Sequence, residues 1–253
     1  SDNVVIAMSS SDTGEATISG TISFTPANWD TPQTITVTGV DENTIDGDQT
    51  STVTITIVDS ISDSDFSNVA DQTVSVVTTD DDAAGFTIEE TDGSTEVDES
   101  GTTDTFTVVL DAQPTSDVVL TITSDDTGEA TVNNPLTFTP ANWDTPQTVT
   151  VTGVDEDIVD GTIASTITVA VDDANSEDDF DAVADQTVSV DTTDDDVAGF
   201  TIVELDGATE VDESGTTDTF TVVLDAQPSD NVVIAMSSSD TGEATISGTI
   251  SFT

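Results

Sequence analysis

The residues of this chain that could do chemistry are carboxylates. The 253 residues include 53 Asp and Glu but no Lys, Arg, His or Cys. The densest acidic run is Asp194-Asp195-Asp196, which copies an earlier run, Asp80-Asp81-Asp82. Each run follows Thr-Thr and is followed, after one residue, by the same segment, Ala-Gly-Phe-Thr-Ile. Because carboxylates are preferred ligands of hard cations, we expect a cation at a joint where one domain ends and its copy begins.

The composition excludes several classes of function. The formal net charge is −53, and self-repulsion at such a charge opposes a compact state, so we expect bound cations or high salt. Without Lys or Arg the chain lacks the cationic side chains that give binding to nucleic-acid phosphates its affinity, so we expect no nucleic-acid partner, and no apolar run approaches the roughly 20 residues of a membrane-spanning helix. Without His, Lys, Arg, Cys or Tyr the usual bases and nucleophiles are missing. We therefore expect no enzyme, since only a carboxylate pair of the glycosidase type remains conceivable.

The chain is organised by an internal repeat of 114 residues. The pentapeptide Thr-Gly-Glu-Ala-Thr occurs three times at this interval, and residues 1–25 are identical to residues 229–253. The period is typical of a single domain, so we predict three tandem units: residues 1–84 as the C-terminal part of one repeat, residues 85–198 as a complete repeat, and residues 199–253 as the N-terminal part of a third. With neither an initiator Met nor a signal peptide, we interpret the chain as an internal piece of a longer protein.

Alternating apolar residues in the complete repeat predict short strands and no helix. Seven strands are expected, over residues 85–88, 105–110, 118–123, 130–139, 148–152, 166–171 and 187–190. Asn134-Pro135 interrupts the fourth strand, which indicates an edge position or a bulge, and Trp143 and its copy Trp29 are expected to plug the core beside a rigid loop. The predicted fold class is all-β, a tandem array of seven-stranded antiparallel Ig-like β-sandwiches.

The predicted topology brings four acidic segments to one end of the sandwich. If the strands alternate in direction, the loops after the first, third and fifth strands lie where the seventh strand closes. These segments carry Asp98 and Glu99; Asp125, Asp126 and Glu129; Asp155, Glu156, Asp157 and Asp160; and Asp194, Asp195 and Asp196. Calcium suits such a cluster because it takes about 6–8 oxygen ligands in irregular geometry, and no His or Cys favours a transition metal. The alternative, that each acidic run is only a solvated face, stays open.

These residues resemble the Calx-beta family, the sandwich domain of sodium–calcium exchangers and of many large bacterial surface proteins. The matching segments span the repeat: Val97–Ser100, Phe106–Leu110, Leu136–Pro140, Thr150–Asp157 and Asp194–Asp196. One departure is Val132-Asn133-Asn134-Pro135, because the family often has an acid followed by an aromatic residue there. The resemblance implies tandem domains of a large bacterial extracellular, adhesin-like protein.

The resemblance also implies calcium ligands by position. In that family calcium is bound by an acid after the first strand, by acids of the loop after the fifth strand and by a terminal acidic triplet. The corresponding residues are Glu99, Asp155, Asp157, Asp160, Asp194, Asp195 and Asp196 and, in the preceding repeat, Asp41, Asp46, Asp80, Asp81 and Asp82.

The function that we predict is structural. The chain would be a calcium-stabilised repeat of an extracellular rod or filament, such as an adhesin extender or surface fibre, with Ca²⁺ bridging successive domains. Its partners would be neighbouring repeats of the same chain and like chains in a filament at the cell surface, where external calcium matches the roughly 10⁻⁴–10⁻³ M affinity of extracellular modules. Two alternatives stay open: a calcium-dependent module that binds a carbohydrate or surface, and a strand-donating subunit of an extracellular fibre.

Overall fold

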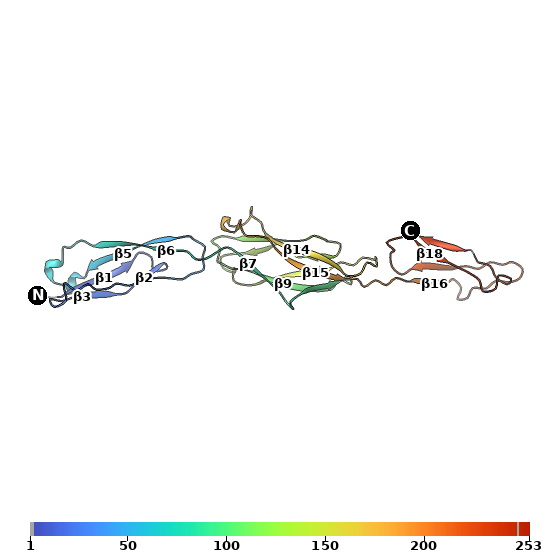
Figure 1. The fold of residues 1–253 in the computed structure, drawn as a ribbon, viewed down its shortest axis with the longest axis horizontal. Helices are drawn as coiled ribbons and strands as arrows, with labels where there is room; N and C mark the ends of the chain where they lie inside the picture. The colour runs from blue at the N-terminus through green and yellow to red at the C-terminus, as the bar shows by residue number, and fades with distance from the viewer. Residues whose placement is uncertain (1–2, 247) are drawn as a thin grey trace.

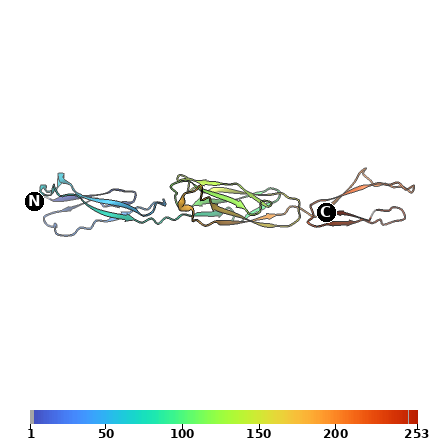
Figure 2. The same cartoon turned by 90° about the horizontal axis from the view of Figure 1, so that it is seen from above.

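The computed structural model describes residues 3–246 and 248–253, which form three β-structured units in a row (Figures 1 and 2). Apart from the 3₁₀ turns η1 (Asp59–Ile61), η2 (Ser64–Phe66) and η3 (Asp178–Phe180), the regular elements of these residues are strands. The described part of the chain has no helix with the length and apolar character needed to span a membrane. The predicted all-β class is confirmed.

The central unit is a sandwich of two sheets, with strand orders β12-β10-β14-β15-β8 and β11-β13-β9-β7. The first sheet consists of β12 (Leu136–Phe138), β10 (Val118–Ser124), β14 (Ile163–Val171), β15 (Gln186–Thr193) and β8 (Thr95–Asp98). The second consists of β11 (Ala130–Val132), β13 (Gln147–Gly153), β9 (Thr103–Leu110) and β7 (Phe86–Glu90). Alternate side chains of each strand are buried between the sheets, as the period-two pattern requires.

The strands differ in detail from the sequence-based prediction of seven antiparallel ones. The expected loop after β7 contains the additional strand β8, because the chain turns at Gly93, whose φ of +87° suits glycine. The fourth predicted strand is divided into β11 and β12 around Asn134-Pro135, since proline has no N–H to donate to a ladder. Strand β8 pairs with β15 in parallel, with Thr95 opposite Val190. This pairing places the residue after β8 beside the acidic triplet after β15.

The core of the central unit lies between the two sheets. Phe106 from β9, Phe138 from β12 and Phe180 from η3 are fully buried within one cluster of apolar side chains. Trp143 is half-buried against this cluster, and its carbonyl accepts a hydrogen bond from the N–H of Leu110 (3.2 Å). Trp143 therefore closes one end of the core, as predicted.

The flanking units contain parts of the same sandwich. Residues 3–84 form a sheet of β3 (Thr21–Phe24), β1 (Val4–Ser10), β5 (Gln49–Ile57) and β6 (Gln72–Thr78), with a second pair, β2 (Ala16–Ile18) and β4 (Val37–Gly39). The last unit has two hairpins, β16 (Phe200–Glu204) with β17 (Phe220–Leu224) and β18 (Val232–Ala235) with β19 (Thr249–Phe252). Contrary to expectation, Trp29 is 72% exposed, because its unit has no counterpart of β9 to cover it.

The core predicts unequal costs for the same substitution in two repeats. Phe106→Ala should lower the free energy of unfolding of the central unit by about 3–5 kcal/mol, the usual cost of removing a buried phenyl ring. Phe220→Ala, at the equivalent position, should cost less because that ring is only half-buried. Urea unfolding of the full chain measures both losses of stability. Equal losses would contradict the conclusion that, of the described units, the central one alone has a complete core.

Candidate metal centre

Glu99 lies within an acidic cluster at one end of the central unit. It follows β8, and its backbone N–H donates to the carbonyl of Thr193 at the end of β15 (3.1 Å). The chain then turns at Gly101, whose φ is +86°. The Glu99 side chain is 0% exposed, and neither carboxylate oxygen has a hydrogen-bond partner among the described residues. Because burying an unpaired carboxylate is costly, this position requires either a proton or a cation.

Asp194 ties the loop between β13 and β14 to the end of β15. Its Oδ2 accepts hydrogen bonds from the N–H groups of Gly161 (2.8 Å) and Asp160 (3.0 Å), and its Oδ1 accepts one from Asp196 (2.8 Å). The N–H groups of Gly161, Asp196 and Asp160 hold the pKa of Asp194 below its usual value. The Asp194 carboxylate is therefore ionised and fixed in place beside Glu99.

Other carboxylates surround Glu99 from two sides. Side-chain oxygens of Glu99, Asp194 and Asp196 lie within 4.8 Å of one another, and the same holds for Glu99, Glu156 and Asp160. Buried oxygens without a hydrogen-bond partner among the described residues also occur on Glu129, Glu156 and Asp196. Four separate segments of the chain, which carry Glu99, Glu129, Glu156 and Asp194, thus present carboxylate oxygens to one small region.

The electrostatics of the cluster favour a bound positive charge. Burial raises the pKa of Glu99 to about 7, and the neighbouring Asp194 adds to the rise. The N–H of Asp195 offsets part of it, although it makes no hydrogen bond of normal geometry with Glu99. Burial also raises the pKa values of Glu129, Glu156 and Asp196, and nearby carboxylates increase each shift. No Lys, Arg or His exists in the chain to neutralise these groups.

The sequence-predicted ligands fall into different places in the structure. Glu99, Asp160, Asp194 and Asp196 come together in the cluster. Asp155, Asp157 and Asp195 are exposed, and their charges raise the pKa of Asp196, behind the main effect of burial. They therefore lie close enough to act on the cluster without belonging to its buried centre.

Two further predicted residues accept backbone hydrogen bonds outside the cluster. Asp98 Oδ1 accepts a hydrogen bond from the N–H of Ser100 (3.0 Å) and another from the Ser100 hydroxyl, so its carboxylate closes the turn beside Glu99. Asp125 Oδ1 accepts from the N–H of Thr166 in β14 (2.7 Å). Neither residue belongs to the carboxylate groups around Glu99.

The preceding repeat has an equivalent arrangement of acids. Asp80 Oδ2 accepts hydrogen bonds from the N–H groups of Gly47 (2.7 Å) and Asp46 (3.1 Å), as Asp194 does 114 residues later. A cavity of about 30 Å³ lies among acids of this end, namely Glu15, Asp41, Glu42, Asp46, Asp80, Asp81 and Asp82. Oxygens of Glu15, Glu42 and Asp46 lie within 4.8 Å of one another. Residues 3–84 contain no counterpart of Glu99, so this copy of the cluster lacks its buried member.

Glu129 and Glu156, with their copies Glu15 and Glu42, were not among the predicted ligands. Glu129 occupies the middle of the repeated pentapeptide Thr-Gly-Glu-Ala-Thr. The presence of this acid in all three copies was the feature of the sequence that could have identified it as a ligand. In the structure Glu129 is only 7% exposed, and its backbone carbonyl accepts a hydrogen bond from the N–H of Val154 (2.9 Å). This bond holds the loop that carries Glu156 against β11.

No family model matches the chain, and no curated protein matches it. Similar solved structures include domains 4 and 5 of the S-layer protein SbsC, at 19% identity over 74% of this chain and 70% of that chain, with a TM-score of 0.36. The apo-form Calx CBD1 domain matches at 16% identity over 44% of this chain and 98% of that chain, with a TM-score of 0.33. The calcium-binding domain CBD12 of CALX1.1 matches at 15% identity over 67% and 68%, with a TM-score of 0.31. Similarity at this level leaves membership of the Calx-beta family a sequence-based prediction.

The raised pKa of Glu99 predicts how pH affects the metal-free protein. In the unfolded chain the Glu99 pKa is near 4.5 and in the folded chain about 7, so the folded state binds the proton more tightly. The contribution of Glu99 to stability should therefore fall as pH rises from about 4.5 to 7 and then level off. In chelator, Glu99→Gln should give a flatter melting-temperature profile over this window than the wild type. Identical slopes would show that Glu99 is not the titrating group.

Proposed function

We propose that this chain is a calcium-stabilised structural repeat of an extracellular rod or filament, with a Ca²⁺ site at the end of each repeat that stiffens the joint to the next. The observation that carries this proposal is the Glu99 carboxylate. It is completely buried, both of its oxygens lack partners among the described residues, and it lies within 4.8 Å of carboxylate oxygens from two other segments.

Calcium is the cation that this donor set fits best. Every side-chain ligand available in the cluster is an oxygen, and calcium takes about 6–8 oxygens in flexible geometry. The chain has no His or Cys to favour zinc or another transition metal. Glu99, Glu156, Asp160, Asp194 and Asp196 would hold the ion, and each ion would neutralise two of the repelling charges.

The loop that carries these acids also contacts the next repeat. In the first joint, Thr44 forms a β-bridge with Gln113: the N–H of Gln113 donates to the carbonyl of Asn43 (2.7 Å), and the N–H of Ile45 donates to the carbonyl of Gln113 (3.3 Å). Ile45 packs against the apolar core of the following unit.

The second joint repeats the contact with Ile158 and Gln227, where the Gln227 N–H donates to the carbonyl of Asp157 (2.5 Å). In both joints the bridging residue lies between acids of the cluster, with Thr44 between Asp41 and Asp46 and Ile158 between Glu156 and Asp160. An ion that orders this loop therefore also orders the contact between repeats. This coupling is the physical basis for a calcium-dependent rod.

Calcium should raise the stability of the chain. Ligand binding to the folded state alone stabilises it by about 2.7 kcal/mol at a concentration 100-fold above Kd, so the melting temperature should rise with calcium and fall again in chelator. Glu99→Gln should remove most of this gain in the central unit while leaving it folded. Differential scanning calorimetry checks both chains, with magnesium at equal ionic strength as the control. A melting temperature independent of calcium would contradict the proposal.

The joint should loosen when its apolar contact is removed. Ile45→Ser deletes the side chain that packs against the core of the central unit, so the first joint should bend more freely. In small-angle scattering with calcium, the variant should therefore show a wider range of end-to-end distances than the wild type. The rise in the melting temperature of the central unit on adding calcium should stay unchanged, because Ile45 is not part of its carboxylate cluster. An unaltered scattering profile would mean that the bridge does not set the geometry of the joint.

A further inference from the structure

The central unit lies in line with its neighbours, and the chain enters it at one end and leaves it at the other (Figures 1 and 2). The entering segment forms β7 and then β8, and the leaving segment is β15. A pull along the chain therefore acts on β8 in one direction and on β15 in the opposite direction. Because β8 and β15 pair with each other, their ladder transmits this load from the entering to the leaving segment.

The geometry of this pair determines how it resists the load. Strands β8 and β15 run parallel, and their register ends with Asp98 opposite Thr193. The backbone N–H of Glu99 continues the ladder by donating to the carbonyl of Thr193 (3.1 Å). Since the opposite pulls act along the two strands, the strands must slide past each other, and the bonds of the ladder are loaded together. Peeling the strands apart from one end would instead break these bonds one at a time.

Strand β8 is also fastened on the side away from β15, where it forms the edge of its sheet. The N–H of Glu96 donates to Oδ2 of Asp104 (2.9 Å), and the N–H of Asp98 donates to the hydroxyl of Thr102 (2.8 Å). Asp104 belongs to β9 of the facing sheet. The short strand β8 is therefore tied to both sheets, and load on it reaches the whole sandwich.

The end of β8 lies directly against the backbone of β13. A Cβ atom at Gly153 would overlap the carbonyl oxygen of Asp98, so glycine is required for this approach. The N–H of Gly153 donates to the carbonyl of Thr102, just after the turn that follows β8 (3.0 Å). These contacts fix the backbone on both sides of Glu99.

The buried acidic cluster lies at the end of the parallel pair. Glu99 follows β8, whereas Asp194 and Asp196 follow β15, and side-chain oxygens of the three lie within 4.8 Å of one another. Glu99 is 0% exposed, and neither of its carboxylate oxygens has a hydrogen-bond partner among the described residues. An ion held by these oxygens would join the ends of the two strands that carry the load.

We propose that the cluster is a mechanical clamp, in which the bound calcium ion must be released before β8 and β15 can slide past each other. The inference rests on the calcium site proposed above and adds the direction of force that the site resists. The ion would act where the load enters, because Asp194 and Asp196 lie in the segment that connects β15 to the next unit.

Pulling on the two ends of the full chain at constant force tests the clamp. Contacts that are broken in the transition state slow unfolding by their whole free energy, so the central unit should unfold up to about 100-fold more slowly at a calcium concentration about 100 times Kd. Glu99→Gln should abolish this effect. Glu96→Gln is the matched control, because it removes an exposed acid of the same strand and should keep the effect.

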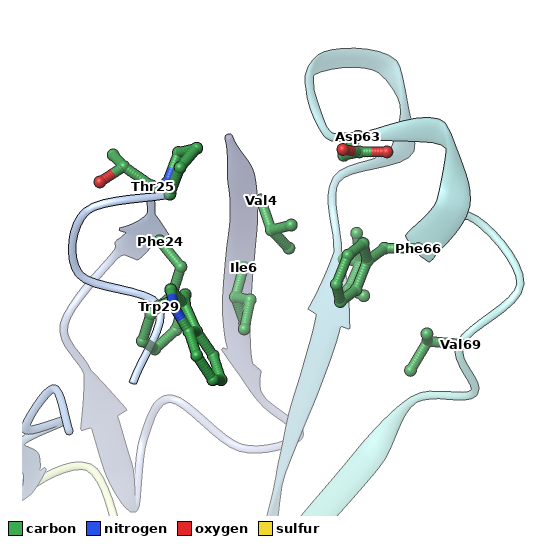
Figure 3. Close-up of a pocket in the computed structure, with 10 residues that line it drawn as sticks. Val4, Ile6, Phe24, Thr25, Trp29, Asp63, Phe66 and Val69 are labelled. Atoms are coloured by element: carbon green, nitrogen blue, oxygen red, sulfur yellow. The ribbon is translucent and has the colours of Figure 1, made fainter. Parts of the chain in front are cut away.

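The last unfolding event in each trace should report on the central unit. In the first unit Trp29 is 72% exposed and Phe66 is 45% exposed, and Figure 3 shows them on opposite sides of an open cavity. In the last unit Phe200 is 52% exposed, whereas Phe180 in the central core is 0% exposed. The less well packed flanking units should therefore unfold at lower force than the central unit.

A second pulling direction separates the clamp from general stabilisation by calcium. The chain has no Cys, so Ser94→Cys combined with Thr187→Cys places handles at two exposed residues near the starts of β8 and β15. Pulling on these handles peels the strands from the end away from the ion, which is still bound in the transition state. Calcium should then change the unfolding rate by less than about twofold.

The outcomes distinguish failure of the clamp from failure of the calcium site. An unfolding rate independent of calcium in end-to-end pulling would overturn the clamp, as would an equal effect of calcium in the two directions or an effect that persists in Glu99→Gln. If the melting temperature still rises with calcium, the clamp alone fails and the calcium site stands. If neither the unfolding rate nor the melting temperature responds to calcium, both proposals fail.

Discussion

The structure depends on how a chain without any basic side chain accommodates its carboxylates. In most proteins a buried Glu is paired with Arg or Lys, but here that option does not exist. The fold nevertheless places Glu99 at 0% exposure beside Asp194 and Asp160. Repulsion and desolvation both oppose this arrangement, and the raised pKa of Glu99 is their direct consequence. A cation from solution, as proposed above, would offset both costs.

The same acids lie in the loop that contacts the next repeat, and the proposed rod depends on this arrangement. Asp194 fixes the loop between β13 and β14 through Gly161 and Asp160, and Ile158 in that loop bridges to Gln227 of the next unit. If an ion binds as proposed, residues 156–161 link it both to the order of the loop and to the contact between repeats. Loops of this kind are normally the least stable parts of a domain, so in the proposed array the stiffness of a joint would depend on the ion that the loop binds.

Much of the fold and of the acidic cluster could be predicted from the sequence, because the repeat aligns without gaps and apolar and polar residues alternate regularly along its strands. The convergence of Glu99 and Asp160 with Asp194 and Asp196 of the triplet followed from strand direction alone. Strand β8 was missed because the four residues Thr95–Asp98 are too few to show a clear period. Glu129 and Glu156 were placed in the converging acidic segments but not singled out as ligands, because acids are so common in the chain that acidity marks no single residue. The exposure of Trp29 could not be predicted from its own segment, since it depends on which strands are present elsewhere.

The central claim is that a calcium ion is bound by the buried carboxylate of Glu99. A crystal structure of the full chain grown in calcium, with anomalous scattering to identify the ion, tests it most directly. The account predicts a calcium ion at roughly 2.3–2.6 Å from an oxygen of Glu99, with further ligands from the loop that contains Asp160 and from the triplet that contains Asp194. A protonated Glu99 with no ion beside it, in crystals saturated with calcium, would contradict the account.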